Sequence, residues 1–215
     1  MYGVEDTLSD DNQAFSVTFG PVTSSDVNYA GKNPDDVSVT NVDNETASIT
    51  VSALSGNTTE MGGTATFTVV LDNQPTADVS IAVSSSDTSE VTISPSSLTF
   101  DSSNYSTLQT VTVTGVDDFY DDDNVSYTIT VDPSSSIASY NTMTSSTVTG
   151  SNIDNDTAAI AVGAKSGNTS EFGTTATINV TLATISTANV SIVVTDNDST
   201  EVSITPTTLT ITPSI

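Results

Sequence analysis

Cysteine, histidine, arginine and tryptophan are all missing from this 215-residue sequence. Without cysteine and histidine there can be no disulfide, no thiolate or imidazole chemistry and no soft-metal site. The only basic residues are Lys32 and Lys165, against 27 acidic ones, which gives a net charge of -25. No basic patch is available to meet phosphates, so nucleic acid is excluded as a partner and anionic membranes are disfavoured.

Long apolar runs are also missing. No stretch approaches the roughly 20 residues of a membrane-spanning helix, and no signal peptide is evident, so we expect no membrane insertion. If the protein is exported, we expect its signal to lie outside this sequence.

Catalytic signatures are scarce. Paired carboxylates could serve a glycosidase, but the sequence has no GxSxG motif, no histidine or cysteine, and no arginine to hold an anion. The acidic residues also recur along the chain, whereas a catalytic site is normally single. We therefore expect that the protein is not an enzyme.

What is present favours strands. Valine and threonine dominate, and helix-forming residues are scarce, so the predicted class is all-β. The high net charge raises disorder as an alternative. Val, Ile, Leu and Phe nevertheless make up roughly a quarter of the chain and alternate with Ser and Thr, which favours order.

An internal repeat organises the chain. The segment Ser55–Thr58 (SGNT) recurs as Ser166–Thr169, and Glu90-Val91 recurs as Glu201-Val202, each offset by 111 positions. This repeat predicts three parts: residues 1–46 as the C-terminal part of a first repeat, 47–157 as a complete repeat, and 158–215 as the N-terminal part of a third.

Alternating runs in the complete repeat predict a sandwich of short antiparallel strands, with turn signals at Asp72–Pro75 and Asp132–Ser134. The expected strands are Ala47–Ser52, Ala65–Leu71, Val79–Ser84, Val91–Ser94, Ser97–Phe100, Gln109–Val113, Val125–Val131 and Thr147–Asn152. In residues 1–46 we expect one strand through Phe15, Val17 and Phe19 and another through Val37 and Val39.

The most acidic stretch is Gly115–Asn124 (GVDDFYDDDN), which holds five aspartates between two predicted strands. A related segment, GVEDTLSDDN, begins at Gly3. Carboxylates at this density repel one another, and two lysines cannot neutralise them. A hard cation held by about six to eight oxygens would, and calcium suits such a loop better than magnesium, which requires a tighter octahedron. The loop is not an EF-hand.

Acidic positions beside other turns recur with the repeat, and we expect these loops to gather at one end of each sandwich. The alternative is a solvated acidic surface that keeps the protein soluble. The predicted metal ligands are Glu5, Asp6, Asp10, Asp11, Asp43, Glu45, Glu60, Asp87, Glu90, Asp117, Asp118, Asp121, Asp122, Asp123, Asp154, Asp156, Glu171, Asp198 and Glu201.

Several of these residues carry a resemblance to a known family. Glu60–Val69, Ile93–Phe100, Val111–Asp118 and Asn152–Asp156 resemble the Calx-beta repeats of large bacterial surface proteins. The resemblance implies an immunoglobulin-like sandwich that binds calcium through two loops and a closing aspartate run. It implicates Asp87 in the first loop, the 117–123 aspartates in the second, and Asp154 with Asp156 in the closing run. Asn155 departs from the pattern by replacing an aspartate, although an amide can still offer a carbonyl oxygen.

The repeat register raises a question of assembly. The last residues and the first residues of the sequence correspond to successive portions of one repeat, separated by a gap of about eight residues that match Tyr105–Thr112. Two interpretations remain open: a fragment of a longer array, which we favour, or a filament in which the tail of one chain completes the head of the next. Tyr29 and Tyr140 occupy matching positions, for which core or edge packing is favoured over carbohydrate stacking.

The sequence thus predicts a calcium-binding structural repeat of an extracellular or cell-surface stalk, adhesin or fibre. A self-assembling extracellular filament and a calcium-sensing regulatory domain are the alternatives. Expected partners are neighbouring repeats of the same chain or subunits of the same protein, with a cell-surface or carbohydrate ligand as a further option.

Overall fold

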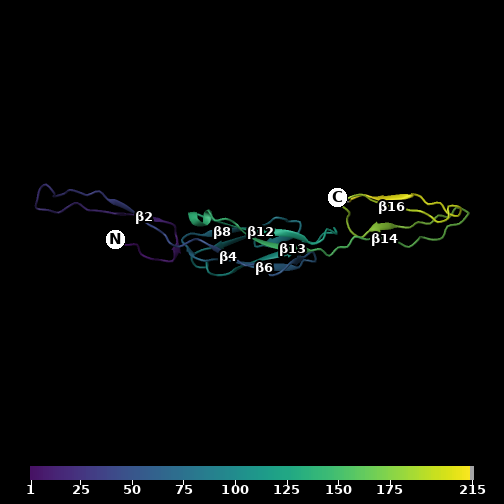
Figure 1. The fold of residues 1–215 in the computed structure, drawn as a ribbon, viewed down its shortest axis with the longest axis horizontal. Helices are drawn as coiled ribbons and strands as arrows, with labels where there is room; N and C mark the ends of the chain where they lie inside the picture. The colour runs from purple at the N-terminus through teal and green to yellow at the C-terminus, as the bar shows by residue number, and fades with distance from the viewer. Residues whose placement is uncertain (214–215) are drawn as a thin grey trace.

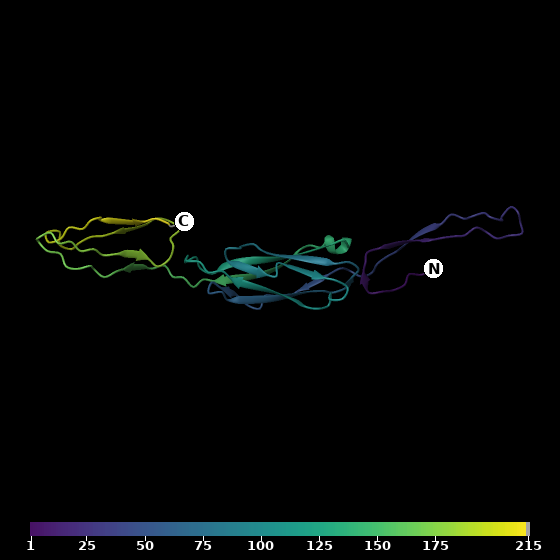
Figure 2. The same ribbon diagram turned by 180° about the vertical axis from the view of Figure 1, so that it is seen from behind.

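The computed structural model describes residues 1–213, which form three parts in a row (Figure 1). A β-sandwich occupies the middle, a long hairpin from the N-terminal part projects from one end, and the C-terminal part follows at the other. The view from behind shows the same order (Figure 2). The parts are built from β-sheets, so the prediction of an all-β class is confirmed.

The central sandwich has two sheets. The first has five strands, in spatial order β10 (Ser97–Phe100), β8 (Val79–Ser85), β12 (Val125–Ser135), β13 (Ser146–Ile153) and β5 (Thr58–Thr59). The second has four, in the order β4 (Ile49–Val51), β6 (Thr64–Leu71), β11 (Gln109–Gly115) and β9 (Val91–Ser94). All pairings within these sheets are antiparallel except the pairing of β5 with β13, which is parallel.

A single hydrophobic core fills the space between the sheets. Alternate residues of β6 and β11, including Phe67 and Val111, are buried and meet the buried alternate residues of β8 and β12, including Ile81 and Ile129. This alternation follows from the two-residue period of a strand, which sends successive side chains to opposite faces. Burial of each such side chain contributes about 1.5–3 kcal/mol.

One predicted turn is wrong. Asp132–Ser134 lies inside β12, where Pro133 pairs with Ile81 of β8. Pairing with β13 has already ended at Val131, so this stretch has only one neighbouring strand. A proline lacks the N–H that a second neighbour would require and is therefore tolerated there.

The short helix α1 (Ala138–Asn141) connects β12 to β13, and its Tyr140 is buried in the core. Within residues 1–213 no helix is long and apolar enough to cross a membrane.

The N-terminal part contains β1 (Leu8–Ser9), β2 (Gln13–Val17) and β3 (Val37–Asn41). β2 and β3 form the projecting hairpin, and β1 pairs in parallel with β7 (Gln74–Pro75) of the sandwich. The predicted strand through Phe19 is shorter than expected, because β2 ends at Val17.

The C-terminal part contains two separate hairpins. β14 (Ile160–Val162) pairs with β15 (Val180–Leu182), and β16 (Val190–Val193) pairs with β17 (Thr208–Ile211). Both keep the register of the sandwich: Ile160 faces Leu182 as Ile49 faces Leu71.

Candidate metal centre

The end of the sandwich that faces the C-terminal part is built around a close backbone crossing. β5 pairs with the end of β13, so that Thr58 lies opposite Asn152. Gly115 passes so near this pair that an added Cβ would collide with the carbonyl oxygen of Thr59 and the side chain of Asn152. Glycine is therefore required where the acidic loop leaves β11, and the crossing brings residue 60 next to residues 154–156.

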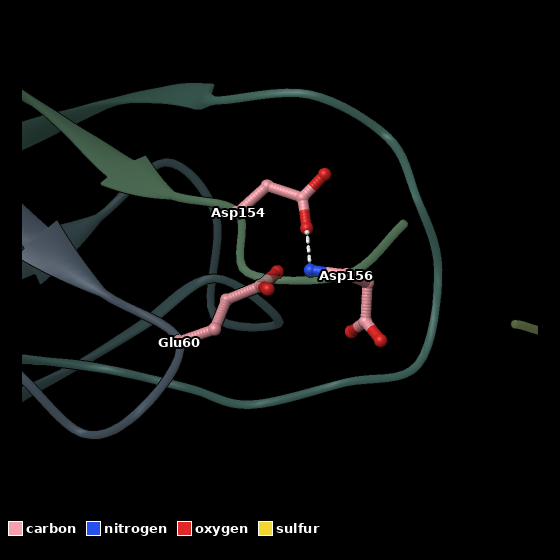
Figure 3. A group of neighbouring side chains, drawn as sticks. All are labelled: Glu60, Asp154 and Asp156. Carbon is pink, nitrogen blue, oxygen red and sulfur yellow. Dashed lines mark hydrogen bonds between the residues drawn. The ribbon is translucent and has the colours of Figure 1, made fainter. Parts of the chain in front are cut away.

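Glu60, Asp154 and Asp156 form the first carboxylate group (Figure 3). One carboxylate oxygen from each lies within 4.8 Å of the others. Glu60 is only 2% exposed, and the two aspartates are half-buried. The backbone N–H of Asp156 donates to Asp154 Oδ1 at 2.7 Å, which folds the closing run into a tight turn.

Glu90, Asp118 and Asp122 form the second group, in which one carboxylate oxygen from each residue again lies within 4.8 Å of the others. Glu90 precedes β9 and is 6% exposed. The two aspartates come from the acidic loop, where the backbone N–H of Tyr120 donates to Asp118 Oδ1 at 2.7 Å. Glu90 and the loop are also tied through the backbone, since Val116 N–H donates to the Glu90 carbonyl at 2.8 Å.

Burial is the largest cause that raises the pKa of Glu60, and repulsion from Asp154 and Asp118 adds to it. Burial likewise raises the pKa of Glu90, reinforced by Asp122, Asp87 and Asp118. Asp118 acts on both glutamates, so the two groups share one electrostatic field.

Two further acids at this end follow the same pattern. The pKa of Asp122 and that of Asp156 are raised by desolvation and then by neighbouring aspartates. Residues 47–157 contain no lysine, arginine or histidine that could offset this negative charge. A cation held between these carboxylates would favour their ionised forms.

Four other predicted ligands take different roles. Asp87 accepts hydrogen bonds from the N–H and hydroxyl of Ser89, which lower its pKa, so Glu90 rather than Asp87 joins the carboxylate group from the first loop. Asp121 Oδ2 accepts from the N–H of Ala158 at 2.7 Å. Asp117 Oδ1 lies 3.4 Å from the side-chain amide of Asn155, and the N–H of Asp123 donates to Asp154.

The N-terminal acids form a related turn without a buried glutamate. The carboxylate of Asp43 accepts hydrogen bonds from the N–H groups of Asp10 and Glu45. The carboxylate of Asp154 accepts in the same way from the N–H groups of Asp123 and Asp156. The remaining predicted ligands there lie around this turn: Asp6 caps Leu8, Glu5 accepts from Asn44, and Asp11 lies beside α1.

The pKa values of Asp43 and Glu45, the two acids of this N-terminal turn, are shifted in opposite directions. Desolvation raises the pKa of Asp43, but hydrogen bonds from Glu45, Asp10 and Asp11 outweigh this effect, so that the pKa of Asp43 is lowered. Desolvation and the neighbouring carboxylates of Asp43 and Glu5 raise the pKa of Glu45.

The C-terminal acids are not brought together. Glu171 and Glu201 are exposed, and Asp198 caps Thr200 as Asp87 caps Ser89. Among residues 1–213, only the Glu60 and Glu90 groups bring three acidic side chains within reach of one ion.

Two asparagines in the site were not predicted in their actual roles. Asn155 acts as a hydrogen-bond donor, since its side-chain amide donates to Glu60. Asn152 is buried and links three elements, accepting from Thr58 Oγ1 at 2.9 Å and donating to Glu90 and to the Val116 carbonyl. The recurrence of Asn152 as Asn41 was the available signal.

Fold and geometry together define an acidic, all-β sandwich within a chain of repeated units, with two carboxylate groups that could hold a metal ion. No model of a known protein family matches the sequence, and no curated protein matches it.

Solved structures give distant matches. Domains 1–6 of the surface layer protein SbsC match with a TM-score of 0.36 and 15% identity, over 82% of this chain and 30% of that one. WR4, a C. elegans MSP family member, matches with a TM-score of 0.30 and 12% identity, over 46% and 89% of the two chains. A PapD-like domain of human CEP192 matches with a TM-score of 0.33 and 14% identity, over 51% and 86%. The likeness is one of β folds and extends no further.

Proposed function

We propose that this chain is a calcium-binding structural repeat of an extracellular stalk, adhesin or fibre. One observation carries the proposal: two buried glutamates, Glu60 and Glu90, each meet two aspartates in a sandwich that has no basic side chain. A buried carboxylate without a counter-charge costs several kcal/mol, so a bound cation should stabilise this arrangement near neutral pH.

Calcium is the ion that this donor set fits best. All the candidate ligands are carboxylates, which are hard oxygen donors. The ligands come from four separate chain segments, two for each group, and such a site adapts better to the irregular shell of calcium than to the strict octahedron of magnesium. The Calx-beta resemblance of the sequence points to the same ion.

The position of the second group supports a mechanical role. Asp118 and Asp122 flank residues 119–121, and these residues contact the next unit: Ile185 N–H donates to the Phe119 carbonyl at 2.8 Å, and Ala158 N–H donates to Asp121. An ion held by the flanking aspartates restrains the segment between them. Calcium therefore stiffens the joint between successive units.

The other joint uses the same loop position. Leu8 of β1 corresponds to Tyr120 of the acidic loop. At this first joint β1 pairs with β7, in the place where the Phe119 carbonyl accepts from Ile185 N–H at the second joint. Recurrence of one joint along the chain favours a stalk over a calcium sensor, which needs a single responsive element and an effector. Because the joint recurs along the chain, and because the chain has no histidine, cysteine or arginine, we propose no catalytic role.

The proposed setting is the cell exterior, where calcium is abundant. Neighbouring repeats or subunits are the partners proposed first, and a cell-surface or carbohydrate ligand is a further one. Mutual repulsion between acidic stalks at a net charge of -25 keeps stalks that stand side by side apart and hydrated.

Thermal unfolding of the full chain in calcium, in magnesium and in chelator tests this function. Calcium at about 100 times its dissociation constant adds roughly 2.7 kcal/mol, which raises the midpoint of a domain this size by about 10 °C. Glu90→Gln should reduce the shift, whereas Glu201→Gln, the same change at the exposed repeat counterpart, should leave it intact. Equal midpoints in calcium, magnesium and chelator would reduce the acids to surface charge.

A further inference from the structure

A cavity of about 900 Å³ lies where the C-terminal part meets the acidic loop. Its walls include Tyr120 from the loop and the apolar side chains of Ile160, Leu182, Ile185 and Val190. Leu182 and Val190 are half-buried here, although their repeat counterparts in the sandwich, Leu71 and Val79, are fully buried.

The sandwich shows what covers the same surface one repeat earlier. There α1 closes over it, and the buried Tyr140 donates its hydroxyl to the Asn73 carbonyl at 3.1 Å. Burial raises the pKa of Tyr140 to about 12. The residue that corresponds to Asn73 is Thr184, which lines the cavity. The cavity is therefore the counterpart of the place that Tyr140 fills.

A matching side chain exists at the far end of the chain. Tyr29 corresponds to Tyr140 and is 60% exposed. Its turn shares one hydrogen bond with α1: Ala30 N–H donates to the Asp26 carbonyl at 3.0 Å, as Asn141 N–H donates to the Ile137 carbonyl at 3.1 Å.

The strands on either side of Tyr29 also match. Val17 faces Val37 in the β2–β3 hairpin as Ile129 faces Val148 in β12–β13. In the sandwich β12 pairs with β8, whose counterpart β16 pairs only with β17 among the described strands. Phe15, the counterpart of the buried Tyr127, is 45% exposed on the free hairpin.

Polar groups complete the correspondence. In the sandwich, Ala138 N–H at the start of α1 donates to Asp11 of the preceding loop at 2.9 Å. Asp11 corresponds to Asp123, and both adopt positive φ, at 60° and 63°. Lys32, one of two basic residues in the chain, lies on the Tyr29 turn, while Asp121 and Asp122 line the cavity.

We infer that a second copy of this chain docks here: its β2–β3 hairpin adds to β16, and its Tyr29 enters the cavity. The hairpin supplies the strands, the aromatic plug and the backbone donor that the sandwich receives from its own β12, α1 and β13. Since each copy carries both surfaces, the contact is heterologous and propagates head to tail. It goes beyond the calcium-stiffened stalk and does not depend on a metal ion.

Sedimentation velocity of the full chain over a concentration series tests the contact, in calcium and in chelator. We expect concentration-dependent species larger than a monomer in both, and more of them as added salt screens repulsion between copies. Tyr29→Ser removes the plug, and Ala188→Trp fills the cavity, so each should weaken association by about tenfold or more. Tyr2→Ser, at an exposed tyrosine outside the hairpin, is the control and should change nothing.

Energy transfer locates the contact. The chain has no cysteine, so Ala30→Cys and Thr187→Cys can carry the donor and the acceptor on separate copies. Transfer that Ala188→Trp abolishes supports docking of the hairpin in the cavity. A monomer at every concentration, or association that both variants leave intact, overturns the proposal. A failed calcium response with association retained would overturn the proposed function alone, because association is scored in chelator as well.

Discussion

The backbone N–H of Asn155 donates to Glu60 Oε2 at 3.0 Å, and the side-chain amide of Asn155 donates to the same oxygen at 3.2 Å. Both hydrogen bonds end on one oxygen, which holds the buried carboxylate in a fixed orientation. Asn155 thus stabilises Glu60 without adding a further negative charge to the group.

Asn155→Asp should reverse this balance. The substitution replaces an amide donor with a fourth carboxylate in the Glu60 group, so in chelator the midpoint of unfolding should fall by the equivalent of about 1–3 kcal/mol. In calcium the extra charge should tighten binding and recover the loss. Asn44→Asp, at the repeat counterpart without a buried glutamate, is the control for thermal unfolding in both conditions. A variant as stable as the wild type in chelator would contradict this role.

Stability should depend on pH in opposite directions with and without calcium. The pKa values of Glu60 and Glu90 are raised in the folded state by burial, so their contribution is fully present below the ordinary glutamate pKa and is lost as pH rises through the folded pKa. In chelator the midpoint should therefore rise on acidification from pH 7 toward about 5.

In calcium the midpoint should instead fall over the same range, because protons compete with the ion for the same oxygens. The pKa of Asp87 is lowered from its ordinary value of 3.8, so protonation of Asp87 changes the midpoint only below that pH and not between pH 7 and about 5. Parallel pH profiles in calcium and chelator would show that the carboxylates with raised pKa values do not bind the ion.

Gly115→Ala should destabilise the sandwich by about 1–3 kcal/mol, because the added Cβ meets the backbone of Thr59, a clash that no side-chain rotation relieves. Gly56→Ala, where nothing lies within 4 Å of the added atom, is the matched control. Denaturant unfolding measures both variants. A Gly115→Ala protein that is as stable as Gly56→Ala would show that the crossing of β5 and β11 is looser than described.

Asp121→Ala should loosen the joint without unfolding the sandwich, since it removes the acceptor of the Ala158 N–H. Small-angle scattering in calcium should show a broader distribution of end-to-end dimensions for this variant. Asp78→Ala, at an exposed aspartate just before β8, should scatter like the wild type. Identical curves for both variants would remove Asp121 from the account of joint stiffness.

The strands of the sandwich could be read from the sequence because their burial alternates with the period of a strand. β8 and β10 begin at the predicted residues, and β6 begins one residue early. Pro133 misled because proline normally breaks a strand, and only the absence of a second neighbour along that stretch of β12 permits it.

The acidic loop was equally evident from its charge, but the partners of its aspartates were not. Glu60 joins the first group because β5 pairs in parallel with the end of β13, residues far apart in the sequence. Glu90 joins the second group instead of Asp87 because the hydroxyl and N–H of Ser89 engage Asp87. Such long-range pairing and local capping choices leave no periodic signal.

Calorimetric titration of calcium into the full chain tests the central claim most directly. The wild type should bind calcium with heat that saturates, and a double variant, Glu60→Gln with Glu90→Gln, should lose that heat. The control with both changes at the exposed counterparts, Glu171→Gln with Glu201→Gln, should titrate like the wild type. Equal titrations for the two double variants, or no saturable heat in the wild type, would contradict calcium binding at the buried glutamates.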